Sequence, residues 1–188
     1  MKLVLASGSP RRRDLLRQIG LDDFIIRVPN AEERPPEGLP PQETVEALSR
    51  QKAEAVRAFP DEIIVAADTM VFLDGLRLGK PRDASDALRM LAALQGRRHA
   101  VCTGVTVRQG ERFLTRSEST DVTFRTASEE TLRRYIATGE PMDKAGAYGL
   151  QGRGALLVER VDGDFSNVIG LPLPLLDSML SEFGWRLL

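Results

Sequence analysis

Short apolar runs alternate along this sequence with longer stretches in which apolar residues return every third or fourth position. The short runs predict buried strands, and the helical spacing predicts amphipathic helices. The predicted strands are Lys2–Ala6, Phe24–Val28, Glu62–Ala67, Met70–Leu73, His99–Arg108, Arg112–Arg125, Ala155–Val161 and Phe165–Ile169. The predicted helices are Pro10–Ile19, Gln42–Phe59, the segment between Asp83 and Gly96, the segment between Ser128 and Gly139, and Leu173–Phe183.

Cap and turn residues support these boundaries. Ser9, Asp83 and Ser128 each stand where a side chain can cap the start of a helix. The Asp-Gly pairs at 74–75 and 162–163 are hairpin signals between apolar runs. Helices that alternate with strands, together with antiparallel hairpins, predict an α/β fold with a mixed sheet.

Length, charge and cysteine content narrow the class of protein. The chain has 188 residues, which favours a single domain over residues 1–188 with room for two lobes. Its formal net charge of −1 gives no electrostatic basis for a nucleic-acid partner. The single cysteine, Cys102, excludes an internal disulfide and a multi-cysteine zinc site, and its apolar surroundings predict a core position.

The sequence contains no segment that predicts a membrane or secretory protein. No apolar run approaches the roughly 20 residues that a membrane-spanning helix needs. The first basic cluster follows a very short apolar stretch, whereas a secretory signal places its basic residues before a longer one. We therefore expect a cytoplasmic protein without a membrane partner.

The first candidate site is the segment Ser7–Arg13, which lies between a predicted strand and a predicted helix. Free backbone N–H groups and the positive end of the helix dipole favour anions at such a junction. Two hydroxyls, a glycine and three guanidinium groups add donors that match phosphate oxygens. Cations in a first turn oppose the helix dipole, and this conflict favours phosphate binding over a simple capped helix.

Acidic residues form a second candidate site. Asp68 follows a run of apolar strand residues, where a lone buried carboxylate is unfavourable unless a cation compensates it. Such an acid can bind a metal, act as a base or cap a neighbouring group, and the sequence leaves all three open. Glu32 and Glu33 lie in a loop with five prolines over residues 29–41. They can supply a second carboxylate for a hard cation such as magnesium, or form a solvated acidic surface.

Two lysines and a glycine-rich segment complete the candidates. Lys80 stands between a glycine and a proline, and therefore on a constrained loop. Lys52 lies within a predicted helix, where a merely exposed lysine is the alternative. Residues 143–152 are rich in glycine, which permits close approach of the backbone to a ligand, and Gln151 offers both an amide donor and an acceptor. A tight structural loop is the alternative interpretation of this segment.

Several common catalytic motifs are absent from the sequence. Residues 75–81 resemble a P-loop, but the spacing is one residue short and Pro81 replaces the hydroxyl residue. No G-x-G-x-x-G follows a strand, which leaves a dinucleotide fold without support. No G-x-S-x-G occurs, and the only histidine, His99, lies in a predicted strand, so a serine or cysteine triad is unsupported.

Taken together, these segments resemble the Maf family of nucleotide pyrophosphatases, whose members were first described as inhibitors of septum formation. The motifs that occur in the family's order are LASGSPRR at 5–12, ADT at 67–69, KPRD at 80–83, DKAGAYG at 143–149 and GLPL at 170–173. The resemblance implies an elongated mixed sheet flanked by helices in two lobes, with a nucleotide cleft between them, similar to the fold of inosine triphosphate pyrophosphatase. It also implies a divalent cation, Mg²⁺ or Mn²⁺, and a homodimer.

The resemblance also assigns roles to individual residues. Asp68 matches the family's proton acceptor, and Glu33 and Asp68 are the carboxylates expected to hold the metal. The other matched active-site and phosphate positions are Lys52, Lys80, Arg12, Ser7 and Ser9. We expect the cationic members of this set to neutralise charge that develops on the phosphates.

Three positions separate the family's subgroups by substrate. The dTTP/UTP type carries an arginine, a threonine and a glutamine, which match Arg11, Thr69 and Gln151, whereas the 7-methyl-GTP type tends to have tryptophan, glutamine and glutamate. A neutral amide can pair with the edge of uracil, whereas a carboxylate suits a cationic methylated guanine. We therefore expect hydrolysis of dTTP, UTP and modified pyrimidine triphosphates to the monophosphate and pyrophosphate.

Two other functions fit the same residues. A nucleotide-binding regulator of cell division and septum formation would bind the nucleotide without hydrolysing it. A phosphatase would use the same charges but would release orthophosphate. The sequence also leaves open whether Asp68 acts as the base or as a metal ligand, because a carboxylate at one position can do either.

Overall fold

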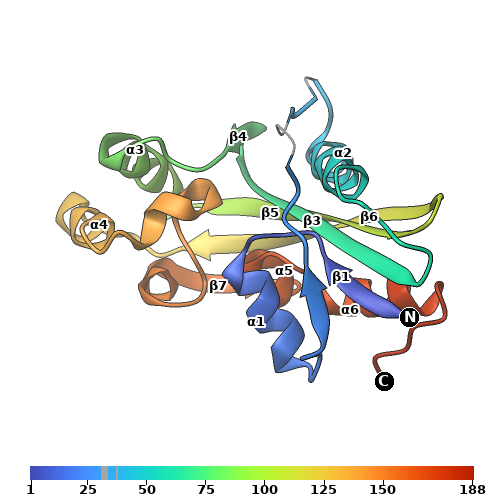
Figure 1. Cartoon of the computed structure of the whole chain (residues 1–188). Helices are drawn as coiled ribbons and strands as arrows, with labels where there is room; N and C mark the ends of the chain where they lie inside the picture. The colour runs from blue at the N-terminus through green and yellow to red at the C-terminus, as the bar shows by residue number, and fades with distance from the viewer. Residues whose placement is uncertain (31–33, 37) are drawn as a thin grey trace. The chain divides into compact units, whose positions relative to one another are not determined.

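The computed structural model describes residues 1–30, 34–36 and 38–188 (Figure 1). Its α-helices are α1 (Pro10–Gln18), α2 (Pro41–Glu54), α3 (Ala84–Leu94), α4 (Glu129–Ile136), α5 (Phe165–Ile169) and α6 (Leu173–Ser181). Its 3₁₀ helices are η1 (Glu140–Asp143), η2 (Ala145–Ala147) and η3 (Arg153–Leu157). Its strands are β1 (Lys2–Leu5), β2 (Phe24–Ile26), β3 (Glu62–Leu73), β4 (Leu76–Leu78), β5 (Arg98–Gln109), β6 (Arg112–Phe124) and β7 (Val158–Asp162).

The strands form a seven-stranded sheet in the order β2-β1-β3-β5-β6-β7, and β4 pairs with β3 beside this path. Strand β1 runs parallel to both β2 and β3. The pairs β3–β4 and β6–β7 are antiparallel. The predicted α/β fold with a mixed sheet is therefore confirmed.

The chain divides into two compact units, each built from separated segments. Unit 1 contains residues 1–68, 103–118 and 170–188, and unit 2 contains residues 69–102 and 119–169. The divisions after residues 68, 102 and 118 fall inside strands β3, β5 and β6. Three long strands therefore contribute residues to both units.

Strand β3 corrects the prediction of two separate strands. The sequence analysis placed one strand at Glu62–Ala67 and a second at Met70–Leu73, whereas the structure has one strand of 12 residues that continues through Asp68. The prediction was wrong because it took a charged residue as the end of a buried strand. The Nζ of Lys52 lies 2.6 Å from the Oδ1 of Asp68, so a cation compensates the carboxylate inside the strand.

The predicted hairpin of Ala155–Val161 and Phe165–Ile169 is also wrong. Residues 153–157 form η3, β7 pairs with β6 instead, and Phe165–Ile169 is helix α5. The Oδ1 of Asp164 accepts hydrogen bonds from the N–H of Ser166 at 2.7 Å and from its hydroxyl at 2.6 Å. Such a local side-chain bond satisfies a backbone donor at the start of a helical turn and competes with strand pairing.

Helix α2 packs closely on strand β5 within unit 1. A Cβ atom added to Gly104 would lie 2.2 Å from the carbonyl oxygen of Val45, so only glycine allows this approach. The hydroxyls of Ser49 and Thr106 are hydrogen-bonded at 2.8 Å. The helix ends before the predicted Phe59 because Arg108 Nη1 donates to carbonyls of its last turn and the residues that follow. These contacts fix the helix that carries Lys52.

Unit 2 has its own apolar core, with helices α3 and α4 side by side (Figure 1). Phe124, His99 and Tyr148 pack edge to face in this core, and the Nε2 of His99 lies 2.8 Å from the Tyr148 hydroxyl. Burial lowers the pKa of His99 to about 4. Cys102 is buried, as predicted, and burial raises the pKa of its thiol.

The predicted helix caps have different outcomes. The side chains of Asp83 and Ser128 accept hydrogen bonds from backbone N–H groups in the first turns of α3 and α4, as predicted. Ser9 precedes α1, but its side chain makes no cap hydrogen bond. Over the described residues, no helix combines the length and the apolar character needed to cross a membrane.

Candidate functional site

A buried arginine organises the junction between β1 and α1 in unit 1. The Nε of Arg12 donates to the carbonyl oxygen of Gly170 at 2.8 Å, and its Nη1 donates to the Ser7 hydroxyl at 3.1 Å. The same hydroxyl oxygen accepts the N–H of Ser9 at 3.2 Å. Arg12 is only 9% exposed. These bonds fix a guanidinium and the Ser7 hydroxyl at the start of a helix.

The start of α1 has the chemical character of an anion site. The first turn contains no acidic residue, while Arg11 and Arg13 flank Arg12 and are half-buried. The side chain of Ser9 does not cap the helix start. The helix dipole places positive partial charge at this end, and arginine donors match the geometry of phosphate oxygens. The junction therefore has the chemical character that favours an anion, and phosphate binding at this place stays a prediction.

Asp68 and Lys52 form the second part of the site. The Nζ of Lys52 on α2 lies 2.6 Å from the Oδ1 of Asp68 on β3, and the two side chains are 14% and 7% exposed. Among the described residues, the Oδ2 of Asp68 is a buried oxygen with no hydrogen-bond partner. An unpaired buried acceptor is costly, so a group that supplies a proton or a cation would be stabilised there.

The pairing of β1 with β3 relates these two parts of unit 1, because the carboxyl end of β1 lies beside β3 a few residues before Asp68. Leu5 lies opposite Val65, and the N–H of Ala6 donates to the Val65 carbonyl at 2.8 Å. Ser7 follows Ala6 directly, and Asp68 lies three residues beyond Val65. The carboxyl end of a parallel strand beside a helix start is a common ligand-binding edge in α/β folds.

The remaining predicted residues have different positions. Glu33 lies outside the described residues, so its place beside Asp68 stays a prediction. Thr69 directly follows Asp68 on β3 and is half-buried, whereas Lys80 and Gln151 are exposed on loops of unit 2. Their convergence on the unit 1 residues also stays a prediction. In the described part of the chain, no group of three or more His, Cys, Asp or Glu side chains is arranged to hold a metal.

Sequence reasoning missed two groups that hold predicted site residues in place. The Gly170 carbonyl holds Arg12 although the two residues are far apart in the sequence. The only sign of Gly170 in the sequence is its place in the GLPL motif. The Glu140 carboxylate binds the backbone N–H groups of Arg153 and Gly154, which follow Gln151. Its acidic side chain stands next to a proline in an irregular segment, which gives no periodic signal.

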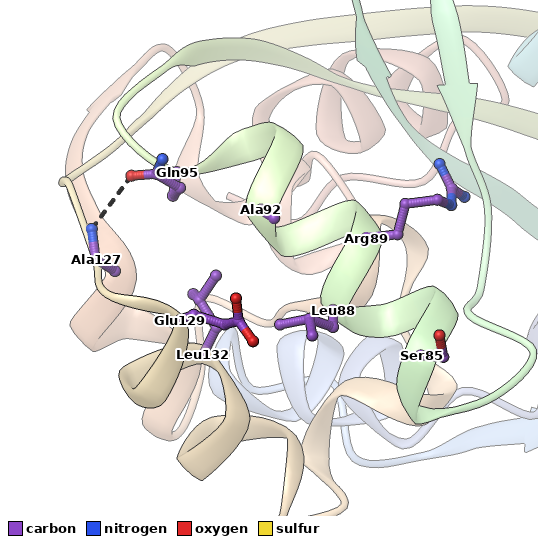
Figure 2. Close-up of a pocket in the computed structure, with 8 residues that line it drawn as sticks. All are labelled: Ser85, Leu88, Arg89, Ala92, Gln95, Ala127, Glu129 and Leu132. Atoms are coloured by element: carbon purple, nitrogen blue, oxygen red, sulfur yellow. Dashed lines mark hydrogen bonds between the residues drawn. The ribbon is translucent and has the colours of Figure 1, made fainter.

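A pocket of about 410 Å³ lies in unit 2 between α3 and α4 (Figure 2). It is lined by Ser85, Leu88, Arg89, Ala92, Gln95, Ala127, Glu129 and Leu132. Gln95 uses its Oε1 to accept the N–H of Ala127 at 3.4 Å, and Glu129 pairs with Arg133. None of the site residues predicted from the sequence lines this pocket, so we assign it no role in the chemistry.

Comparison with known proteins identifies relatives of this chain. The family model described as Maf-like protein matches residues 2–183. A dTTP/UTP pyrophosphatase of Symbiobacterium thermophilum is 48% identical over 185 residues, which cover 98% of this chain and 95% of that protein. A dTTP/UTP pyrophosphatase of Moorella thermoacetica is 50% identical, over 97% of this chain and 95% of that protein.

The solved structures support the fold independently of close sequence similarity. The structure of the Staphylococcus aureus Ham1 protein matches 97% of this chain and 100% of that chain, with a TM-score of 0.54 and 14% sequence identity. At this identity the likeness concerns the fold alone. It agrees with the mixed α/β architecture described above.

Proposed function

The chain belongs to the family of Maf-like proteins, and from this premise we propose that it hydrolyses dTTP and UTP to the nucleoside monophosphate and pyrophosphate. Relatives that are 48% and 50% identical over nearly the full chain are named dTTP/UTP pyrophosphatases. Two of the five motifs that resemble the family, LASGSPRR and ADT, form the β1–α1 junction and contain Asp68. The proposal therefore rests on the activity named for these relatives and on residues here that can bind phosphate and accept a proton.

The observation that supports the proposal most strongly is the difference between the two carboxylate oxygens of Asp68. Its Oδ1 is paired with Lys52, while its Oδ2 is buried and, within the described residues, has no hydrogen-bond partner. This oxygen can accept a proton from a water molecule, which then attacks the α-phosphorus in line. The new P–O bond forms as the bond between the α-phosphorus and the bridging oxygen breaks, and pyrophosphate leaves. Lys52 holds the carboxylate in one orientation through this ion pair.

Cationic groups would stabilise the charge that develops during this reaction. Arg12 is fixed by Ser7 and Gly170 before substrate arrives, so little reorganisation is needed when the phosphates bind. We propose that Ser7, Ser9 and Arg12 contact the phosphate oxygens, and that Lys80 reaches the same group from its loop. Such preorganised donors stabilise the transition state more than flexible ones do.

We propose that the reaction requires Mg²⁺ or Mn²⁺. The unpaired Oδ2 of Asp68 fits a hard cation, because these metals prefer carboxylate oxygens and often take only one or two from the protein. Glu33 would supply the second carboxylate. A bound divalent cation would neutralise phosphate charge and polarise the phosphoryl group.

We propose that Arg11, Thr69 and Gln151 select the pyrimidine base. The amide of Gln151 has a donor and an acceptor, which complement the imide edge of uracil and thymine. The side chain is exposed, so it is accessible to a nucleotide. Modified pyrimidines that keep this edge, such as 5-methyluridine and pseudouridine triphosphates, should also be substrates.

We further propose that the protein is a cytoplasmic homodimer that forms one folded domain. Light scattering coupled to size-exclusion chromatography tests the dimer directly. A mass equal to one chain of 20.8 kDa would exclude it.

The decisive experiment is a panel of purified nucleoside triphosphates with Mg²⁺ or Mn²⁺, in which the phosphorus products are identified by NMR spectroscopy. We expect UMP and dTMP together with pyrophosphate, and loss of activity with a chelator. Release of orthophosphate and a nucleoside diphosphate would show a phosphatase instead. Tight binding of nucleotide without hydrolysis would favour the regulator of cell division.

A further inference from the structure

Gln151 lies in a short loop of unit 2 whose two ends nearly touch. We call residues Gly149–Gly154 the glycine loop. A Cβ atom added to Gly154 would lie 2.3 Å from the carbonyl oxygen of Gly149, so the first and last residues of the loop are in direct backbone contact. Gly152 has a φ of +86°, a conformation that favours glycine. The loop is therefore a closed, tightly turned structure with Gln151 exposed near its middle.

The two ends of the glycine loop are anchored to the same pair of side chains. The Oε2 of Glu140 accepts the N–H of Arg153 at 2.9 Å, and its Oε1 accepts the N–H of Gly154 at 3.0 Å. The Tyr135 hydroxyl donates to Oε1 of Glu140 at 3.0 Å and accepts the N–H of Gly149 at 3.3 Å. One carboxylate and one hydroxyl thus connect the start of the loop to its end.

The anchor itself is held by the core of unit 2. Tyr135 is on α4 and is only 6% exposed, within the main apolar cluster of the unit. The ammonium group of Lys144 donates to the backbone carbonyl of Glu140 at 2.5 Å and to Oδ1 of Asp143 at 2.6 Å. These contacts keep the Glu140 backbone in place while its carboxylate points to the loop.

The side chains of Glu140 and Lys144 pack directly against Gly152 and Gly149 of the glycine loop. A Cβ atom added to Gly152 would lie 2.8 Å from Oε2 of Glu140, and one added to Gly149 would lie 2.7 Å from Cε of Lys144. Burial raises the pKa of Glu140, but the N–H groups of Gly154 and Arg153 and the Tyr135 hydroxyl outweigh it, so the pKa is below its usual value. Glu140 is therefore ionised at neutral pH, and hydrogen bonds to an ionised acceptor are stronger than neutral ones.

We propose that Glu140 and Tyr135 are positioning residues that hold the glycine loop in the shape that presents the Gln151 amide to the base of the substrate. This inference rests on the proposed role of Gln151 in base selection. An amide discriminates uracil from cytosine only when its donor and acceptor are held in one orientation, because the two bases exchange these groups at the same edge. A loop ordered before binding also avoids the entropy cost of ordering during binding.

The first test replaces Glu140 by glutamine, which keeps the shape of the side chain but removes its charge and converts one acceptor into a donor. We expect the KM for UTP to rise about tenfold, as one charge-assisted hydrogen bond is lost, while kcat stays within about twofold. The preference for UTP over CTP should fall in the same variant. Tyr135→Phe removes the hydroxyl alone and should raise the KM about threefold.

The matched control is Glu130→Gln on α4, the helix that carries Tyr135. Glu130 pairs with Arg134 on the surface and makes no contact with the glycine loop among the described residues. Its kinetic constants should equal those of the unchanged protein. A decrease in the UTP preference of this control would show that any charge loss near α4 has the same effect, and would overturn the proposal.

The second test measures hydrogen exchange of the backbone amides without nucleotide. Glu140→Gln should accelerate exchange at Arg153 and Gly154, and Tyr135→Phe at Gly149, with little change elsewhere in unit 2. This readout does not depend on catalysis, so it tests the anchor even if the protein hydrolyses neither UTP nor dTTP and the proposed function fails. Unchanged exchange in both variants would overturn the proposal.

The combination of both readouts excludes a merely structural role. If exchange accelerates in Glu140→Gln but the KM and the UTP preference stay unchanged, the loop does not present Gln151 to the base and the proposal is wrong. A fall in kcat at constant KM would contradict it as well. If Glu140→Gln does not fold, the same criteria apply to Tyr135→Phe, which removes no charge.

Discussion

The charged cluster of unit 1 and the glycine loop of unit 2 differ in which part of the chain the structure holds in place. In the cluster, which comprises Arg12, Lys52 and Asp68, the side chains are largely buried and are held by side-chain partners or by a carbonyl far along the chain. In the glycine loop, Gln151 is exposed, and the backbone on either side of it is what the structure holds. In the function that we propose, the buried charges would act on the reacting phosphate, whereas the ordered backbone of the loop would present the group that recognises the base.

This difference implies that catalysis and recognition are separable by mutation. A buried carboxylate with an unpaired oxygen affects the transition state, so its loss should lower kcat. A loop that presents an amide to the base affects binding in the ground state and the transition state alike, so its loss should raise the KM. Point substitutions in each region can show whether effects on kcat and effects on KM are separate.

Asp68→Asn should have the largest effect. It preserves the shape of the side chain but removes the charge that can accept a proton or hold a cation. We expect kcat for UTP to fall about 100-fold or more, with a smaller change in KM, as for the loss of a general base. Steady-state kinetics measure both constants. Asp61→Asn, at an exposed position paired with Lys2, is the control and should leave kcat unchanged.

Gly104→Ala should perturb the cluster of unit 1 through its scaffold. The new Cβ would meet the Val45 carbonyl at 2.2 Å, and backbone atoms on both sides must shift. We expect a loss of about 1–3 kcal/mol in the free energy of unfolding, as for other overpacked sites, and a lower kcat because α2 carries Lys52. Urea unfolding measures the stability. Gly79→Ala, where nothing lies within 4 Å of the new Cβ, should cost much less.

His99 should make unit 2 sensitive to pH through stability and not through chemistry. Its pKa is about 4 in the folded protein, because burial disfavours the charged form, and about 6.5 in the unfolded chain. Between these values the unfolded state binds the extra proton, so the free energy of unfolding falls as the pH falls. The His99 contribution should decrease by about 2 kcal/mol from pH 8 to pH 5.

Urea unfolding at both pH values, compared with the same measurement on His99→Gln, isolates this contribution. The variant cannot titrate at this position, so its stability should depend less on pH by about the same amount. An identical pH dependence in both proteins would show that His99 does not stay neutral in the core.

Gln151→Glu should have the smallest effect and should sharpen the contrast with Asp68. The carboxylate lacks the amide donor, so the pairing with uracil loses one hydrogen bond. We expect the KM for UTP to rise about tenfold or less at nearly constant kcat. The exposed Gln18→Glu in α1 is a matched control for the change in charge. A fall in kcat equal to that of Asp68→Asn would contradict the separation of the two regions.

The sequence predicted most of the fold because its elements follow local rules. Asp83 and Ser128 begin helices with side-chain caps, and the Asp-Gly pair at 74–75 joins β3 to β4, as their residue types require. Two of the failures have a common cause in contacts between residues that are far apart in the sequence. Asp68 continues a strand because of Lys52, and α2 ends early because Arg108 takes its last carbonyls.

The residues proposed for the site have signals in the sequence, but the groups that hold them in place do not. The basic junction and the isolated acid were visible as local conflicts with helix and strand rules. Gly170, which holds Arg12, and Glu140, which holds the glycine loop, were not visible, because the backbone contacts through which they act leave no periodic pattern in the sequence. Ser9 also lacks the predicted cap bond, and its backbone N–H donates instead to the Ser7 hydroxyl.

The placement of the unit boundaries inside β3, β5 and β6 has a consequence for how this protein can be dissected. Residues 68 and 69 are joined by a peptide bond in the middle of a strand, and the chain crosses between the units again within two further strands. A deletion or a fragment that keeps one unit whole would sever strands of the other. Neither unit can therefore be transferred to another protein by recombination. The contribution of each unit must be measured with point substitutions in the intact chain.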